Sequence, residues 1–164
     1  MTPDLDPAPI VRPTARALLV DDRGRVLLFS SVSEDDGCTF WYPPGGGLEG
    51  DETYEQAAIR ELQEETGLRV THLGAPFARR HDVRTMGGVY YDFREQWFLV
   101  RVPAFDIDTD GFTHDERATI TQHRWWSVDE LCATTDRLTP TTLPDLLGRL
   151  LTVGPPAEPW TLSR

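Results

Sequence analysis

Residues 51–66 constrain the fold more than any other segment, because they predict a helix with a defined start and stop. Most of them are good helix formers, and Asp51 or Thr53 can cap the amino end. Gly67 follows as a carboxyl-terminal stop. The run 43–47, Pro-Pro-Gly-Gly-Gly, precedes the helix, and its glycines permit a close backbone approach that a side chain would prevent. The sequence therefore predicts a glycine-rich loop that leads into a helix.

Three glutamates of this helix fall on neighbouring turns of one face. Glu61, Glu64 and Glu65 have the spacing i, i+3 and i+4, and like charges at this spacing cost a helix about 0.2 to 0.5 kcal/mol each. A solvated acidic face is the ordinary explanation of such a run. The glutamates share an arc of the helix with mostly apolar residues, namely Tyr54, Ala57, Ala58 and Leu62. Because this arc faces inward, with Ile59 on the other side as an exception, the pattern favours a metal site.

The acidic composition limits the partners of the chain. Its 164 residues are enough for one domain with a substantial core, and the formal net charge is −11. This charge opposes sequence-independent attraction to nucleic-acid phosphates, so no nucleic-acid partner is expected. A phosphate compound can still bind where a cation or a local arginine cluster overcomes the field of the protein.

The basic and sulfur-containing residues exclude further kinds of chemistry. The chain has arginine but no lysine, which excludes a Schiff-base lysine and a Walker-type phosphate lysine. Cys38 and Cys132 form no CxxC pair, so they indicate a reducing compartment, with core packing as their expected role. The first residues lack an apolar signal core, and no later stretch is long and apolar enough to span a bilayer. We therefore expect a cytoplasmic protein without a membrane partner.

The remaining segments predict an α/β fold with a mixed sheet. The proline-rich start, 1–13, is expected to be a flexible arm, 14–153 the domain, and 154–164 a proline-rich tail. Strands are expected at 15–20, 25–30, 39–42, 69–83, 89–102 and 123–126, the first two joined as a hairpin. After an acidic loop at 106–116, one further helix is expected to start at Ser127 and another to cover 141–151.

The segment 46–68 resembles the Nudix box. Its sequence, GGLEGDETYEQAAIRELQEETGL, matches the pattern G-x5-E-x7-R-E-U-x-E-E-x-G-U at every fixed position, where U is bulky and aliphatic. Average residue usage makes this match a chance event of about one in a billion per start point. The fixed positions are Gly46, Glu52, Arg60, Glu61, Leu62, Glu64, Glu65, Gly67 and Leu68. Trp41 and the Pro-Gly-Gly run before the box also resemble the family, whereas Gly50-Asp51-Glu52 departs from the glycine that many relatives have directly before this glutamate.

The resemblance implies the Nudix fold, an α/β/α sandwich around a mixed β-sheet, and a metal-dependent hydrolase that cleaves a diphosphate linkage. Carried over by position, it implies that Glu61, Glu64 and Glu65 bind Mg²⁺ or Mn²⁺, with the Gly46 carbonyl as a candidate further ligand. Magnesium suits such a site independently, because it prefers oxygen ligands and is commonly held by a few carboxylates together with substrate phosphates.

The other catalytic candidates surround these glutamates. Arg60 and Glu52 are expected to orient the metal ligands, because an arginine cannot act as a base and can hold carboxylates by paired hydrogen bonds. Glu65 is the ligand expected to help activate water. Glu116 stands in a region where relatives often supply another carboxylate, and an ordinary exposed loop glutamate is the equal alternative.

Candidates for substrate binding lie outside the box. Arg79, Arg80 and Arg84, together with His81, form the densest basic cluster and could receive substrate phosphates. A solvated strand edge is the alternative for this cluster. Trp41 is a candidate for base stacking, although most aromatic residues in strands belong to the core.

The expected substrate is a small molecule in which a nucleoside diphosphate is linked to another group, such as a nucleoside triphosphate, a dinucleotide or a nucleotide sugar. The region 84–87 has neither the proline associated with ADP-ribose cleavage nor the tyrosine associated with diadenosine polyphosphates. A nucleotide-binding sensor of this fold is an alternative, but such proteins usually lose box glutamates. An isoprenoid diphosphate isomerase is a further alternative, although Cys38 does not stand in the context of its catalytic cysteine. The oligomeric state is left open, a homodimer included.

Overall fold

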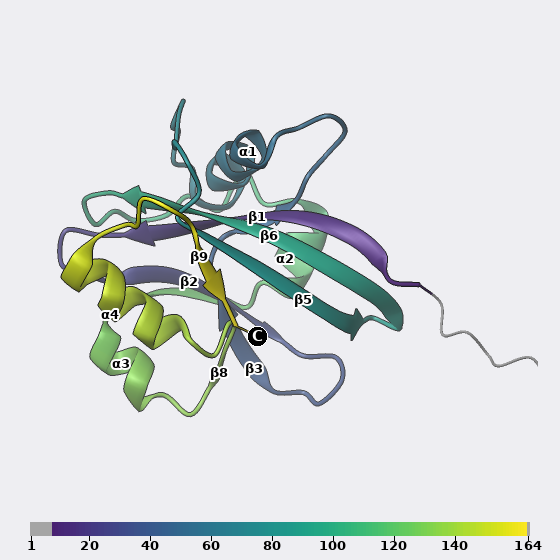
Figure 1. Cartoon of the computed structure of the whole chain (residues 1–164). Helices are drawn as coiled ribbons and strands as arrows, with labels where there is room; N and C mark the ends of the chain where they lie inside the picture. The colour runs from purple at the N-terminus through teal and green to yellow at the C-terminus, as the bar shows by residue number, and fades with distance from the viewer. Residues whose placement is uncertain (1–7, 164) are drawn as a thin grey trace, which may run out of the picture.

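The computed structural model describes residues 8–163, and it shows a curved sheet with helices on both faces (Figure 1). The strands are β1 (Ile10–Val20), β2 (Val26–Val32), β3 (Thr39–Tyr42), β4 (Gly45–Gly47), β5 (Ala78–Met86), β6 (Val89–Arg101), β7 (Gln122–Trp126), β8 (Arg137–Leu138) and β9 (Trp160–Leu162). The helices are α1 (Tyr54–Thr66), α2 (His114–Thr119), α3 (Val128–Ala133) and α4 (Leu143–Val153). These elements give the α/β fold that the sequence predicts.

The sheet is mixed, as predicted. Its strand order is β8-β3-β2-β1-β6-β5-β9, with β4 also paired to β1 and β7 to β2. The pairs β1–β6, β3–β8 and β5–β9 are parallel, and the other pairs are antiparallel. The predicted β1–β2 hairpin is present at its turn, where Val20 pairs with Val26. The two strands then diverge, so that β1 lies against both β6 and the short glycine strand β4.

Strand β1 is the central strand of the sheet. Its alternate side chains point into the layers on the two faces. On one face Ala15 packs with Ala57 and Ala58 of α1. On the other face Leu18 and Val20 join a larger apolar cluster that includes the leucines of α3 and α4. Helix α1 is therefore held directly above β1 (Figure 1), and it also contacts the short strand β4.

Local signals set the bounds of α1 as predicted. Of the two expected caps, Thr53 is the one used: its side chain accepts the Gln56 backbone N–H, and the Gln56 side chain accepts the Thr53 N–H in return. The helix ends at Gly67, which adopts the left-handed conformation with φ of 75°. Because few residues other than glycine adopt this conformation cheaply, Gly67 stops the helix where the sequence places the stop.

Several predicted bounds are wrong, each for a tertiary reason. The strand expected at 69–83 begins only at Ala78, because Glu55 of α1 accepts the backbone N–H groups of Leu73 and Gly74 and ties the preceding loop to the helix. Strand β1 starts at Ile10, inside the segment expected to be an arm, because β6 pairs with it along its whole length. The rest of that arm, 1–7, lies outside the described residues.

Two further elements were not predicted from the sequence. The tail beyond α4 contains β9, which pairs with β5, and the acidic loop contains α2, which begins with a capping box at Thr113. The expected core packing of Cys38 and Cys132 is also wrong, because both cysteines are exposed. Within the described part of the chain, no helix has the length and apolar character that crossing a membrane would require.

Candidate active site

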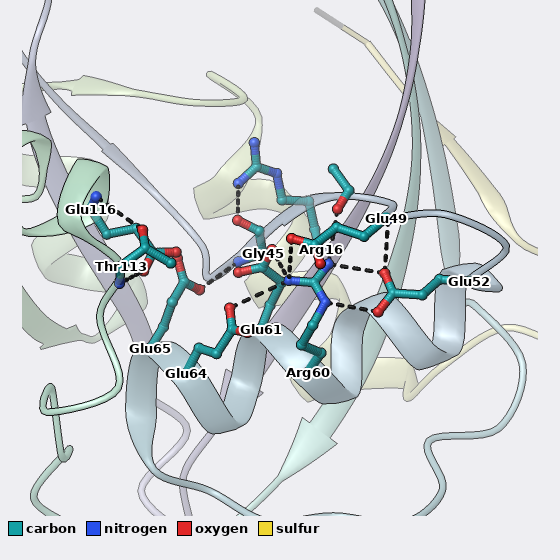
Figure 2. A network of polar contacts seen from close by, with 11 residues as sticks. Arg16, Gly45, Glu49, Glu52, Arg60, Glu61, Glu64, Glu65, Thr113 and Glu116 are labelled. Carbon is teal, nitrogen blue, oxygen red and sulfur yellow. Dashed lines mark hydrogen bonds and ion pairs between the residues drawn. The ribbon is translucent and has the colours of Figure 1, made fainter.

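The glycine strand β4 and helix α1 meet at the Glu61 carboxylate. Strand β4 pairs with β1 and runs across the inward face of α1. A Cβ atom at Gly46 would lie only 2.2 Å from Glu61 Oε1, so glycine is required for this approach. The neighbouring Gly45 donates its backbone N–H to Glu65 Oε2 over 2.8 Å. The glycine run therefore brings the backbone into direct contact with two of the predicted metal ligands (Figure 2).

Three carboxylates converge at this point. One oxygen each of Glu61, Glu65 and Glu116 lie within 4.8 Å of one another. Glu61 and Glu65 are buried, and Glu61 Oε2 has no hydrogen-bond partner among the described residues. Glu116 comes from α2, where the Thr113 N–H donates to its carboxylate. Helices α1 and α2, which are far apart in sequence, thus supply one cluster of carboxylates (Figure 2).

The negative charges of these closely spaced carboxylates favour a bound cation. Burial, and then the charge of Glu61, hold the pKa of Glu65 well above its usual range. Burial also raises the pKa of Glu61, against the lowering effect of Arg60. Closely spaced oxygen donors, one of them a buried oxygen without a partner, fit a divalent ion such as Mg²⁺ or Mn²⁺. A bound ion would satisfy the free oxygen and favour the charged form of each carboxylate.

Glu64 lies at the edge of this group. Its Oε2 accepts a hydrogen bond from Arg60 Nη1 over 3.3 Å, and about a third of its side chain, 32%, is exposed. Among the described residues the mutually close carboxylates are Glu61, Glu65 and Glu116, without Glu64. The role of Glu64 as a ligand stays a prediction, as does that of the Gly46 carbonyl.

Arg60 links the helix to the loop before it. Its guanidinium donates to both oxygens of Glu52, over 2.8 and 3.0 Å, and to Glu61 Oε1 over 2.9 Å. It also donates to the Gly47 carbonyl over 3.0 Å. The Arg60 hydrogen bonds hold the pKa of Glu52 below its usual value. Arg60 and Glu52 therefore form a brace from which the Glu61 carboxylate is oriented.

The predicted basic cluster is divided between the two faces of β5. Arg79 is exposed on one face, whereas Arg80 and Arg84 share the other. Arg80 is buried and pairs with Glu95 and Asp82. Arg84 also pairs with Asp82, with its guanidinium over an aromatic ring of β6. The three arginines consequently cannot act as one cluster, and Arg84 is the half-buried member.

The indole of Trp41 lies in the core. It is 4% exposed and packs edge-on against Trp126, with ring centroids 4.9 Å apart. Its Nε1–H donates to Asp136 over 2.9 Å. These contacts favour the core alternative for Trp41 over base stacking.

Sequence reasoning missed Arg16 of β1. Its Nη1 donates to the Pro43 and Gly45 carbonyls over 3.4 and 3.3 Å. No local pattern reveals this contact, because it depends on the pairing of β1 with β4. For helix α2, which carries Glu116, a sequence signal was available: Thr113 and Glu116 have the spacing of a capping box.

Comparisons with known proteins agree with this geometry. A family model described as NUDIX domain matches residues 11–146. The RNA pyrophosphohydrolase of Novosphingobium aromaticivorans is 32% identical over 130 residues, which cover 73% of this chain and 80% of that protein. The RNA pyrophosphohydrolase of Cereibacter sphaeroides is 33% identical over 140 residues, covering 79% and 84%.

Solved structures show the same fold. The MutT protein from Methanosarcina mazei Go1 superposes with a TM-score of 0.64 at 18% identity, covering 88% of this chain and 95% of that one. The MutT NUDIX hydrolase from Burkholderia pseudomallei gives a TM-score of 0.62 at 20% identity, covering 85% and 98%.

Proposed function

The chain belongs to the Nudix family of diphosphate-cleaving hydrolases, and from this premise we propose that Glu61, Glu65 and Glu116 hold Mg²⁺ or Mn²⁺ at the cleaved bond. The observation that carries this proposal is the cluster of three carboxylates, two of them buried, with an unpartnered oxygen on Glu61. Glu64, at the more exposed edge of the cluster, is proposed as a further ligand on the substrate side. The family needs a divalent metal, and carboxylate oxygens suit hard ions such as these two.

When bound, the ion supplies charge neutralisation of the diphosphate and a more acidic water. The residues of the chain supply position and proton transfer. Arg60 fixes Glu61, and the Gly45 N–H fixes one oxygen of Glu65. The other oxygen, Glu65 Oε1, is the proposed acceptor of the proton from the attacking water, because it belongs to the carboxylate cluster while the Gly45 N–H holds the opposite oxygen. Glu116 is the alternative acceptor, since it belongs to the same cluster.

We propose a small nucleotide-linked diphosphate as the substrate. The net charge of −11 supports this choice, because it opposes contact with a long polyanion. Among the predicted substrate residues, Arg84 is the proposed substrate contact, because its guanidinium is only half-buried on the sheet face. A second candidate is the 5′ end of RNA, which is favoured by relatives named RNA pyrophosphohydrolase.

We also propose a cytoplasmic location. Cys38 and Cys132 are exposed and free, and unpaired exposed thiols are typical of a reducing compartment. Fractionation of cells that produce a tagged chain would test this location.

The test of the proposed function is a screen of nucleoside triphosphates, dinucleotides, nucleotide sugars and triphosphorylated RNA with Mg²⁺ and Mn²⁺. Glu65→Gln and Glu64→Gln are expected to lower turnover by orders of magnitude while the fold, followed by circular dichroism, is preserved. Normal turnover in Glu65→Gln would overturn the metal assignment. Tight binding of a compound by the parent without cleavage would favour a sensor.

A further inference from the structure

Arg16 forms a hydrogen bond with strand β4 from the face of the sheet opposite helix α1. It lies on β1 in register with Gly45 of β4. Its Nη1 donates to the carbonyl oxygens of Gly45, over 3.3 Å, and of Pro43, over 3.4 Å. Because the three residues of β4 are all glycine, no side chain of that strand restrains its backbone. Strand β4 is therefore held by its backbone pairing with β1 and by side chains of neighbouring elements.

A buried acidic partner holds the Arg16 guanidinium in turn. Its Nε lies 3.7 Å from Glu95 Oε1, and the Glu95 side chain is 1% exposed. Trp97 Nε1 donates to Glu95 Oε2 over 3.0 Å, and Arg80 pairs with the same oxygen over 3.5 Å. Glu95 is thus fixed from two sides, and the Arg16 side chain, 17% exposed, has little freedom to swing away.

Gly45 connects Arg16 to a carboxylate of the proposed metal site. The N–H of Gly45 donates to Glu65 Oε2 over 2.8 Å, while the carbonyl of Gly45 accepts from Arg16 (Figure 2). Two residues further on, Arg60 holds the Gly47 carbonyl over 3.0 Å. One arginine on each side therefore fixes the strand that carries the Glu65 hydrogen bond.

We propose that Arg16 is a positioning residue for metal binding, acting on Glu65 through Gly45. This inference rests on the proposed function, since it assigns Glu65 to the metal. Loss of Arg16 frees β4 to shift, lengthens the Gly45–Glu65 hydrogen bond and leaves Glu65 poorly oriented. Removal of a residue that orients a metal ligand typically costs about 10- to 100-fold in metal affinity or activity, and this is the loss expected here.

The test compares Arg16→Met and Arg16→Lys with the parent and with Arg149→Met. Arg149 of α4 lies over the ring of Trp160 in β9, and Arg149→Met serves as a control for losing one arginine. Affinity for Mn²⁺ is measured by calorimetry without substrate, and kcat and KM are measured at saturating Mn²⁺. Thermal unfolding reports the fold.

Arg16→Met is expected to weaken Mn²⁺ binding by about 10- to 100-fold and to lower kcat, with KM close to that of the parent. Arg16→Lys is expected to recover part of the affinity, because lysine keeps the charge and can donate to one carbonyl. The control is expected to bind Mn²⁺ as the parent does. If Arg16→Met does not fold, Arg16→Lys and Glu95→Gln, which loosens the anchor, decide the question by the same measurements.

Two results would overturn the positioning role. Parent-like Mn²⁺ affinity with a lower unfolding temperature would make Arg16 a purely structural residue. A raised KM with unchanged Mn²⁺ affinity would make it a substrate contact. A parent that binds Mn²⁺ but cleaves none of the diphosphates contradicts the proposed reaction and leaves the link from Arg16 to metal affinity measurable. A parent that binds no Mn²⁺ contradicts both.

Discussion

Replacing Gly46 with alanine would set a methyl group against the Glu61 carboxylate. The new Cβ would lie 2.2 Å from Oε1 and 2.8 Å from Cδ of Glu61, whereas ordinary contact begins at 3.4 Å. The backbone at Gly46 is outside the left-handed region, so the substitution itself brings no backbone strain. The carboxylate must consequently move by about 1 Å, and a displacement of this size in a catalytic site can cost about 100-fold in rate.

The effect of Gly46→Ala on stability should be much smaller. Alanine reduces the conformational freedom of the unfolded chain, which stabilises by about 0.4 to 1 kcal/mol. Weakening the hydrogen bond between Arg60 and Glu61 costs about 1 to 3 kcal/mol. The net loss, between about 0 and 2.6 kcal/mol, leaves a typical domain folded.

The assay measures turnover with Mg²⁺ and thermal unfolding for Gly46→Ala and for Gly47→Ala. A Cβ at Gly47 would find its nearest neighbour, Arg12 Nε, at 3.7 Å, which is ordinary contact. Gly47→Ala is therefore expected to keep most of the activity. Parent-like turnover in a folded Gly46→Ala variant would refute the conclusion that the position of the Glu61 carboxylate controls the reaction.

Two further predictions concern stability. Trp41→Phe should lower the free energy of unfolding by about 1 to 3 kcal/mol, because it removes the hydrogen bond to Asp136. KM should stay unchanged. A raised KM in steady-state kinetics would instead support base stacking by Trp41. Glu55→Gln should lower the unfolding temperature at about pH 7, because the Glu55 carboxylate holds the backbone N–H of Leu73. Backbone hydrogen bonds hold the pKa of Glu55 below its usual 4.5, so this stabilisation is present above that pH and is lost as the pH falls through the lowered pKa. Denaturation curves of parent and variant should therefore converge at low pH, and a gap that persists there would contradict the assignment. His72→Ala should have a smaller effect than Glu55→Gln: His72 Nδ1 lies 2.7 Å from Glu55 Oε1, but the His72 side chain is 77% exposed, and exposed ion pairs contribute little.

The sequence predicted the features that depend on neighbouring residues. Helix α1 follows from the Thr53 cap, the helix formers and Gly67, all within one segment. The inward placement of Glu61 and Glu65 follows from the periodicity of that helix, and both are buried. The box pattern predicted the family, because it is itself a local run of residues.

Contacts between distant segments could not be predicted in this way. The pattern at 69–83 is that of a strand, but the contact of Glu55 with Leu73 keeps its first part irregular. Strand β9 lies in a proline-rich tail, and only its pairing with β5 makes it a strand. Hydrogen bonds of this kind depend on which backbone groups the fold brings together.

The site likewise combines features set by local sequence with contacts set by the tertiary structure. The sequence alone determined the helix, its glutamates and the glycine run that approaches them. Only the tertiary structure brought Glu116 of α2 to Glu61, and Arg16 of β1 to Gly45. A helix fixes the spacing of its own side chains through its geometry, whereas the distance between two elements depends on how their apolar faces pack, which no single segment encodes.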